Sequence, residues 1–199
     1  MKKYLLLFIS IIFLSNSFAQ ELGLRISTTY NNKIKKNLPI GSGFFIKVNT
    51  ESKKFSFLVF ADFLSNKNFQ YENMTTITKY KNNSFGFAPV IKKLLNRHLI
   101  LGIGPTVSLS FMKMESEKYF NPTLNLYSKC NQEDFGLGVL GIVEYAGLWN
   151  SRFNAIAFVN PTHFTLIESN EKATKYNNAW SIENSFGTNI NIGVSYSLP

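Results

Sequence analysis

His163 and Thr165 are the first pair of side chains in this sequence whose types suit nucleophilic chemistry. They stand in the segment Pro161-Thr162-His163-Phe164-Thr165, and a histidine can activate a hydroxyl by accepting its proton. A hydrolytic site also needs an orienting acid that converges on the histidine in space, and two residues on one segment do not supply it. We therefore expect His163 to be structural, at the junction of a strand and a loop.

The other reactive residue types lack partners at the spacing that their chemistry needs. His98 has no second ligand at strand or helical spacing, so we predict no metal site. Cys130 is the single cysteine, which excludes an internal disulfide; we expect a thiol, with oxidative pairing to a second chain as the alternative. The Gly-x-Gly runs at 41–43, 102–104 and 136–138 do not open helices, so they predict close packing and no bound cofactor.

Four charged residues, Arg25, Lys47, Glu144 and Arg152, lie on the polar faces of segments that alternate between apolar and polar residues. Where such faces enclose an interior, the charges must be paired, because an isolated buried charge costs on the order of several kcal/mol. We predict that Glu144 bridges to Arg25 or Arg152, with Lys47 nearby. The alternative is that these groups reach water at the rim and contribute little.

Alternation of period two along most of the chain indicates strands with unlike faces. In the last segment Ile190, Ile192 and Val194 alternate with Asn191 and Gly193. Strands of soluble proteins usually have about five or six residues, whereas a tilted strand that crosses a bilayer needs roughly 9–11. Most of the predicted strands are long enough to cross, and they lie at 22–30, 40–50, 55–65, 84–93, 98–112, 134–147, 152–161 and 185–198.

Two of these strands carry bulky groups on the face that we assign to the interior, and two contain awkward prolines. A narrow barrel needs its inside filled, so an apolar filling from the third and seventh strands is acceptable. Pro89 and Pro105 predict a bulge or locally broken pairing. The bulky interior residues are Leu58, Phe60, Ile156 and Phe158.

The connections between the strands are alternately long and short. Outer-membrane barrels have an even number of strands, long extracellular loops and short periplasmic turns. With a periplasmic N-terminus, all the long connections fall outside the cell, where we expect any extracellular partner to bind. These are 31–39, 66–83, 113–133 and 162–184, and the short ones are 51–54, 94–97 and 148–151.

The N-terminal segment has the pattern of an export signal. Lys2 and Lys3 precede the apolar run 5–14, and the small residues Ser17 and Ala19 stand at −3 and −1 of a cleavage site before Gln20. The apolar run is too short to span a bilayer. Removing residues 1–19 takes away two lysines and no acids, so the formal charge falls from +9 to +7.

The basic residues of the 199-residue chain are scattered along its connections, although only 17% of all residues are charged. Nucleic-acid binding would need the positive charge gathered on one surface, so we predict no nucleic-acid partner. Basic loops above a bilayer could instead meet the phosphates of outer-membrane lipid and lipopolysaccharide. Ordinary solvated charge is the equal alternative, because exposed lysines are readily screened.

Two resemblances to known families follow from these segments. The run 84–91, Ser-Phe-Gly-Phe-Ala-Pro-Val-Ile, and the glycine-rich run 99–104 that follows a tight turn resemble the porin-like "outer membrane protein beta-barrel domain" family of Bacteroidetes. That resemblance implies a location in the outer membrane and a β-barrel fold, and it implies no shared enzymatic activity. The chain departs from the family by ending in Leu198-Pro199, where members commonly end in an aromatic residue. The pair His163 and Thr165 resembles the His-x-Ser pair of outer-membrane lipid A deacylases, with threonine in place of serine.

We therefore predict an all-β fold, an eight-stranded antiparallel transmembrane up-and-down β-barrel in the outer membrane, formed by residues 20–199 as a monomer. Its lumen should be plugged, because eight strands leave room only for side chains. The expected role is structural, adhesive or partner-binding, with no enzymatic activity and no cofactor. The alternatives are an outer-membrane lipid-modifying hydrolase and a secreted soluble barrel that binds an apolar ligand; a soluble barrel would turn its apolar faces inward.

Overall fold

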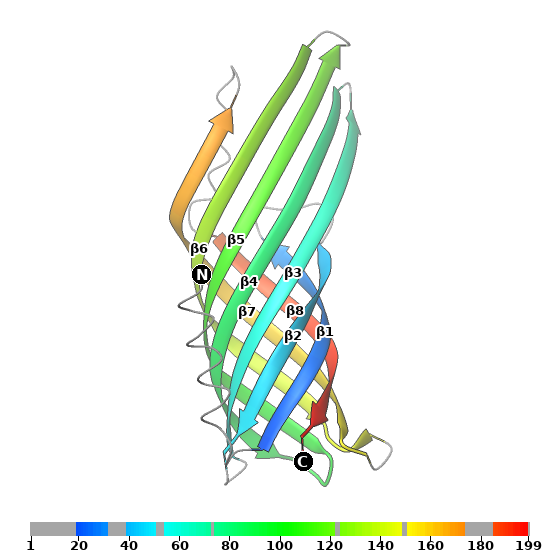
Figure 1. The fold of residues 1–199 in the computed structure, drawn as a ribbon, viewed down its shortest axis with the longest axis vertical. Helices are drawn as coiled ribbons and strands as arrows, with labels where there is room; N and C mark the ends of the chain where they lie inside the picture. Colours follow the sequence, from blue (N-terminus) through cyan, green and yellow to red (C-terminus); the bar gives the residue numbers. More distant parts are fainter. Residues whose placement is uncertain are drawn as a thin grey trace.

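A computed structural model shows that the chain forms a closed barrel of eight antiparallel strands, each hydrogen-bonded to its neighbours in sequence, with β1 pairing with β8 (Figure 1). The structure describes residues 19–31, 39–50, 54–72, 74–121, 124–148, 151–173 and 185–198. The strands are β1 (Ala19–Asn31), β2 (Ile40–Asn49), β3 (Phe55–Glu72), β4 (Met74–Leu94), β5 (Leu99–Asn121), β6 (Leu124–Tyr145), β7 (Phe153–Ala173) and β8 (Ser185–Ser197).

The predicted fold class and strand count are confirmed, and so is the direction of the two faces. Leu24, Ile26 and Ile192 on the exterior are 67–69% exposed, while Arg25 on the opposite face of β1 is 3% exposed. This arrangement is the reverse of a soluble ligand-binding barrel. Among the described residues no helix has the length and apolar character needed to cross a membrane.

The prediction of long extracellular loops is wrong for most of their length. Residues 66–72 belong to β3 and residues 74–83 to β4, and the two strands stay paired up to Glu72 and Met74. Residues 113–121 likewise belong to β5 and residues 124–133 to β6, and these strands pair up to Asn121 and Leu124. Beyond the bilayer neither face of a strand needs to be apolar, so the alternation that marks a transmembrane strand fades although the ladder continues. Residues 32–38 and 174–184 of the other two predicted loops lie outside the described residues.

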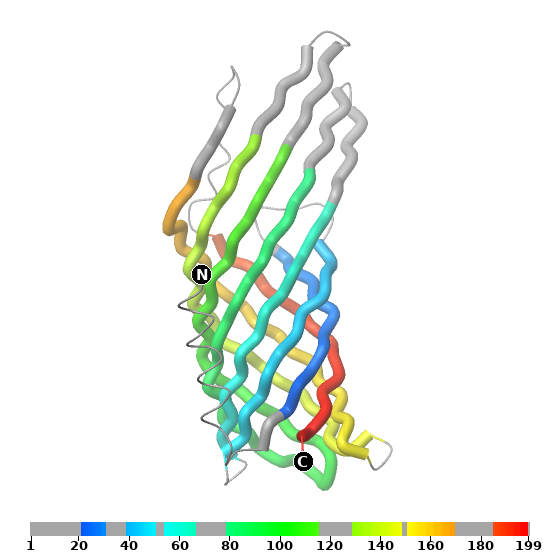
Figure 2. The backbone as a smooth tube through the Cα atoms, in the orientation of Figure 1, coloured from blue at the N-terminus to red at the C-terminus, as the bar shows by residue number. Residues whose placement is uncertain are grey.

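The strands differ greatly in length around the barrel. β1, β2 and β8 have 10 to 13 residues, whereas β3 to β7 have 18 to 23. In Figure 2 the coloured parts of β4 and β5 continue well beyond the ends of β1, β2 and β8. The parts of β3 to β7 that extend beyond the ends of β1, β2 and β8 rise from one side of the barrel. We call these extensions the wall.

Short turns close the other end of the barrel, where β8 also ends (Figure 1). The Asn96 side chain accepts hydrogen bonds from the backbone N–H groups of His98 and Leu99, at 3.0 and 2.8 Å, and so holds the β4–β5 turn. Gly147, in the β6–β7 turn, has a φ of +71°, a conformation in which a side chain would be strained. These turns match the short periplasmic connections that the sequence predicts.

The prolines interrupt the ladder where the sequence predicts broken pairing. Between β4 and β5 the pairs Phe87–Val107 and Ile91–Ile103 are formed, and the positions between them, which include Pro89 and Pro105, are unpaired across this seam. The register is the same on both sides of the gap, so the prolines remove hydrogen bonds without adding a bulge. Each proline still pairs with its other neighbouring strand.

Candidate functional site

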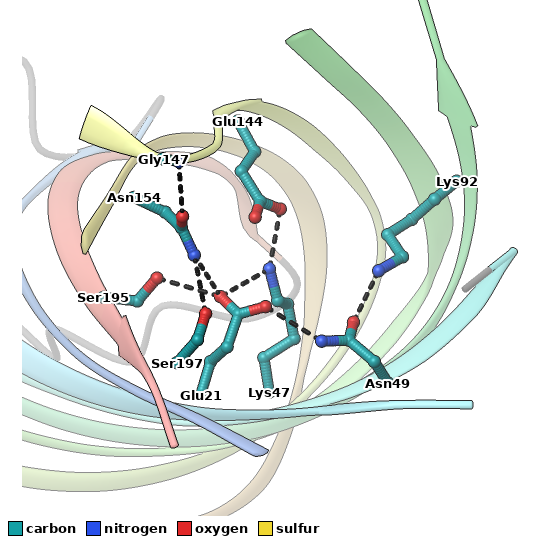
Figure 3. A network of polar contacts seen from close by, with 9 residues as sticks. All are labelled: Glu21, Lys47, Asn49, Lys92, Glu144, Gly147, Asn154, Ser195 and Ser197. Atoms are coloured by element: carbon teal, nitrogen blue, oxygen red, sulfur yellow. Dashed lines mark hydrogen bonds and ion pairs between the residues drawn. The ribbon is translucent and has the colours of Figure 1, made fainter. Parts of the chain in front are cut away.

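The polar interior at the end that carries the short turns is built around Lys47 of β2. Its Nζ lies 2.8 Å from Glu21 Oε2 of β1 and 2.6 Å from Glu144 Oε2 of β6. Figure 3 shows the ammonium group between the two carboxylates. The three side chains are 1–7% exposed, so both ion pairs are buried.

Neutral groups complete the hydrogen bonding of Glu21. Asn49 Nδ2 donates to its Oε1 at 2.8 Å, and Asn154 Nδ2 and Ser195 Oγ donate to its Oε2, each at 3.0 Å. Lys92 Nζ in turn donates to Asn49 Oδ1 (Figure 3). Because a buried ion pair offsets its desolvation cost only when the remaining lone pairs are also satisfied, these donors let the charges remain inside the barrel. Four strands, β1, β2, β7 and β8, are tied together at Glu21.

A second ion pair joins β1 to β3. Arg25 donates from Nε to Asp62 Oδ1 at 2.7 Å and from Nη2 to Asp62 Oδ2 at 2.5 Å, and Ser27 Oγ adds a bond to Oδ1 at 2.6 Å. The guanidinium also lies over the rings of Phe60 and Phe158, 4.5 and 5.1 Å from their centroids. This bidentate geometry, covered by aromatic faces, holds the charge firmly in place.

Three of the four residues of the predicted charge network lie in the lumen, and their ion pairs differ from the predicted ones. Lys47, Glu144 and Arg25 are all buried in the lumen, but Glu144 pairs with Lys47 and not with Arg25. Arg152 is exposed in the β6–β7 turn, outside the strands, and it is not part of the network. The reason is register: Arg25 lies two inward positions along β1 from Glu21, next to Gly43 of β2, and so comes level with Asp62.

Sequence reasoning missed the two acids that complete the clusters, Glu21 and Asp62. Glu21 shares the polar face of β1 with Arg25, so the alternation alone could have found it. Asp62 follows Leu58 and Phe60 on the inward face of β3, where bulky neighbours hid the signal.

Apolar side chains fill the lumen beside these ion pairs. Phe45 and Phe158 meet edge to face, with ring centroids 5.1 Å apart. The four bulky residues that the sequence placed inside are at most 3% exposed. The buried apolar cluster consists of Phe45, Leu58, Phe60, Ala88, Val90, Leu140, Ile142, Ile156 and Phe158.

Two glycines of the Gly-x-Gly runs explain how so much fits in a narrow barrel. A Cβ on Gly43 would lie 2.2 Å from Asp62 Oδ1, and one on Gly104 would lie 1.8 Å from the Pro89 carbonyl oxygen. Both distances are shorter than nonbonded atoms tolerate, so a side chain at either position would force its neighbours to move. The prediction of close packing is confirmed at these positions.

The histidines and the cysteine are apart from the ion pairs. His98 Nδ1 lies 3.0 Å from the Ala146 carbonyl oxygen and its ring stacks on Tyr145, so these contacts join the β4–β5 turn to the β6–β7 turn. His163 and Thr165 are exposed on the exterior of β7. Cys130 is buried on β6, with Sγ 3.6 Å from Ser169 Oγ, and does not lie in a loop as predicted. Within the described residues no group of three or more His, Cys, Asp or Glu side chains is placed to hold a metal ion.

A row of outward-facing phenylalanines encircles part of the barrel below the wall. Phe44, Phe63, Phe85 and Phe111 belong to the successive strands β2 to β5, and neighbouring rings have centroids 6.2, 6.3 and 6.3 Å apart. Each ring is 41–46% exposed. Aromatic girdles of this kind lie at the membrane interfaces of outer-membrane barrels.

No protein-family model and no curated protein sequence matches the chain. Among solved structures, Neisserial surface protein A (NspA) is similar, with a TM-score of 0.59 at 14% identity over 91% of this chain and 97% of that chain. A major outer membrane protein of Thermus thermophilus gives 0.58 at 9% identity, over 90% and 100%. Ail of Yersinia pestis, in complex with the heparin analogue sucrose octasulfate, gives 0.51 at 10% identity, over 91% and 97%.

These similarities establish the fold, which is that of small outer-membrane β-barrels. A closed barrel with an apolar, aromatic-flanked exterior satisfies its backbone hydrogen bonds internally, as a bilayer requires. The fold and the exterior together assign the protein to the bacterial outer membrane.

Proposed function

We propose that this protein is a monomeric, non-conducting and non-enzymatic outer-membrane barrel that presents the wall outside the cell as a surface for adhesion or partner binding. The unequal strand lengths carry the proposal. A crossing strand needs roughly 9–11 residues; β1, β2 and β8 have 10 to 13, close to this length, whereas β5 has 23. The residues of β3 to β7 that exceed the length of a crossing extend beyond the bilayer. Because these five strands are consecutive in the barrel, their extensions form one continuous surface.

The filled lumen supports a function that does not depend on conduction through the barrel. The apolar cluster and the two ion-pair groups occupy the interior with side chains that are almost fully buried. Open aqueous pores belong to barrels of about 16–18 strands. A steady large conductance is therefore not expected of this barrel.

The side of the wall at β3 offers one way to bind a partner. Beyond the pair Ile40–Ser65, no described strand pairs with β3 on its β2 side, although β3 continues to Glu72. A strand edge that lacks a neighbour is a template on which an extended peptide can add a strand.

Two finer parts of the proposal concern origin and export. We propose that the chain is a member of the Bacteroidetes-type porin-like barrels, supported by the runs at 84–91 and 99–104, and that export removes residues 1–19. Ail, which shares the fold, is known in complex with a heparin analogue. A sulfated glycan is for that reason one of the partners to test.

The experiment removes the outer part of the wall and keeps the barrel. Residues 69–77 and 117–127 are each replaced by an Asn-Gly turn, which suits a two-residue hairpin between paired strands. Asn68–Thr78 and Ser116–Ser128 are paired positions, so each ladder closes in its present register. Cells that display the full or the trimmed protein are then tested for adhesion to immobilised glycans and matrix proteins, and to one another.

We expect adhesion with the full protein and its loss with the trimmed one at equal surface levels. Equal adhesion by both proteins, or none by either, would overturn the binding role. Planar-bilayer recordings of the full protein test the closed lumen separately, since a stable porin-sized conductance would contradict it.

A further inference from the structure

Lysines on the exterior of the wall are grouped just above the row of phenylalanines. Lys113 follows Phe111 by two residues on β5, and Lys81 lies four residues beyond Phe85 on β4, all on the outward face. At about 3.4 Å per residue, the Lys113 Cα is roughly 7 Å along the strand from that of Phe111. The two ammonium groups therefore stand at the level where the hydrocarbon of the bilayer gives way to headgroups.

The register sets these lysines side by side in two rows. Lys81 is directly opposite Lys113 in the β4–β5 ladder. In the next outward row Lys79 is opposite Glu115, which is opposite Lys129 of β6. Four lysines and one glutamate give this lysine patch a formal charge of +3.

Glu115 lies among the lysines and compensates only part of their charge. Its Oε1 is 2.8 Å from Lys113 Nζ. The hydrogen bond from Lys113 lowers the pKa of Glu115, and the charges of Lys113, Lys129 and Lys79 add to this effect against an opposing effect of burial. The carboxylate thus remains ionised, and the patch keeps its excess of positive charge.

Like charges directly opposite on neighbouring strands destabilise a sheet unless something neutralises them. Lys81 and Lys113 form such a pair, at a height where the outer leaflet presents phosphates. Acidic residues lie below the patch, at the level of the phenylalanine row, because Glu133 of β6 is opposite Phe111 and is paired with the exposed Glu168 of β7. In the row of Lys79 and Lys129 the register continues to Lys67 of β3 and Lys172 of β7, so the lysines of this row extend over the flanking strands.

We propose that the lysine patch binds the phosphate groups of a phosphorylated glycolipid of the outer leaflet, of the lipid A class. The acyl chains of that lipid pack on the apolar exterior below the phenylalanine row, and its phosphates bridge Lys81 and Lys113. The proposal rests on the membrane orientation in the proposed function, with the wall outside the cell. Binding here anchors the base of the wall to the leaflet and leaves its upper part for a partner.

The test measures binding of lipid A to the full protein refolded in detergent micelles, with native mass spectrometry to count retained lipids. Lys81→Gln/Lys113→Gln should bind about thirtyfold more weakly, the loss expected from two lysines near an anionic surface. The matched control, Lys54→Gln/Lys93→Gln, removes two exposed lysines at the periplasmic end and should change affinity less than twofold. Lys81→Arg/Lys113→Arg should retain binding, because the positive charge remains.

Three results would overturn the proposal. The first is an unchanged affinity in the glutamine variant, and the second is equal binding of lipid A from which the phosphates have been removed. The third is saturation of the same lysines by inorganic phosphate or sucrose octasulfate at the concentration at which lipid A binds, since the site would then take a free anion. The trimmed protein keeps all four lysines, so it should bind lipid A whether or not its adhesion is lost.

Discussion

Lys47 in the lumen and Lys113 on the wall are the same residue type in opposite circumstances. Lys47 is 1% exposed and lies between two carboxylates, whereas the Lys113 side chain is 46% exposed and contacts Glu115. Inside the barrel every charge must find its partners within the chain, because water cannot supply them. Outside, solvent satisfies the charge, so the chain can leave an excess that attracts an external anion.

Replacing Lys47 by Met should give the largest loss of stability. Glu144 and Glu21 would remain buried without their common cation, and breaking such a pair costs about 3–5 kcal/mol. Urea titration of protein refolded in vesicles, followed by the gel mobility of unheated samples, measures the effect. Lys113→Met is the control and should cost less than about 1 kcal/mol, because exposed pairs contribute little. Equal losses in both variants would mean that the interior is wet.

Val194→Lys tests the lipid-facing exterior of the barrel, where lipid offers a charge no partner. Val194 is 50% exposed on the exterior of β8, and a lysine near the midplane should cost roughly 2–4 kcal/mol. Leu198→Lys places the same charge on the same face at the periplasmic end and should cost about 0–1 kcal/mol. The same urea assay compares the two. A larger cost at Leu198 would contradict the assigned depth of β8 in the membrane.

Glu144→Gln should have a smaller effect than loss of Lys47. Lys47 keeps its contact with Glu21, and a glutamine oxygen can still accept a hydrogen bond, so a loss of about 1–3 kcal/mol is expected. Glu133→Gln, an exposed acid on the same strand, should stay within about 0.5 kcal/mol. An unchanged urea midpoint for Glu144→Gln would remove Glu144 from the stabilising network and leave the pair of Lys47 with Glu21.

Glu115 should give the smallest effect and a pH dependence of known sign. Its pKa is lowered by the hydrogen bond from Lys113, so its contribution to stability is present above its ordinary pKa and is lost as the pH falls through the lowered value. Lys113→Gln should raise the pKa of Glu115 towards its ordinary value, which a carbon-13 NMR titration of the carboxyl group detects. Lys93→Gln should leave it unchanged. A pKa that stays low in Lys113→Gln would assign the shift to other groups.

The strands within the membrane could be read from the sequence because their chemistry alternates there. A bilayer on one face and a packed lumen on the other force residues such as Ile192 and Asn191 into strict order. The glycines and the prolines were also informative, since each acts through its own backbone. The outer half of β3 to β7 was missed, because both faces of a strand in water tolerate polar residues and period two no longer distinguishes strand from loop.

The sequence by itself determined the barrel, the direction of its faces and the need for charges inside it, since these follow from local alternation and from the cost of burying polar groups. Only the tertiary structure decided which charges pair. Lys47 and Glu144 are 97 residues apart, and Arg25 and Asp62 are 37 apart. Their meeting depends on register summed over several strands and on the curvature of the closed sheet. A shift of two residues at any seam would keep these side chains inside and change which charges meet, and no local pattern in the chain records that sum.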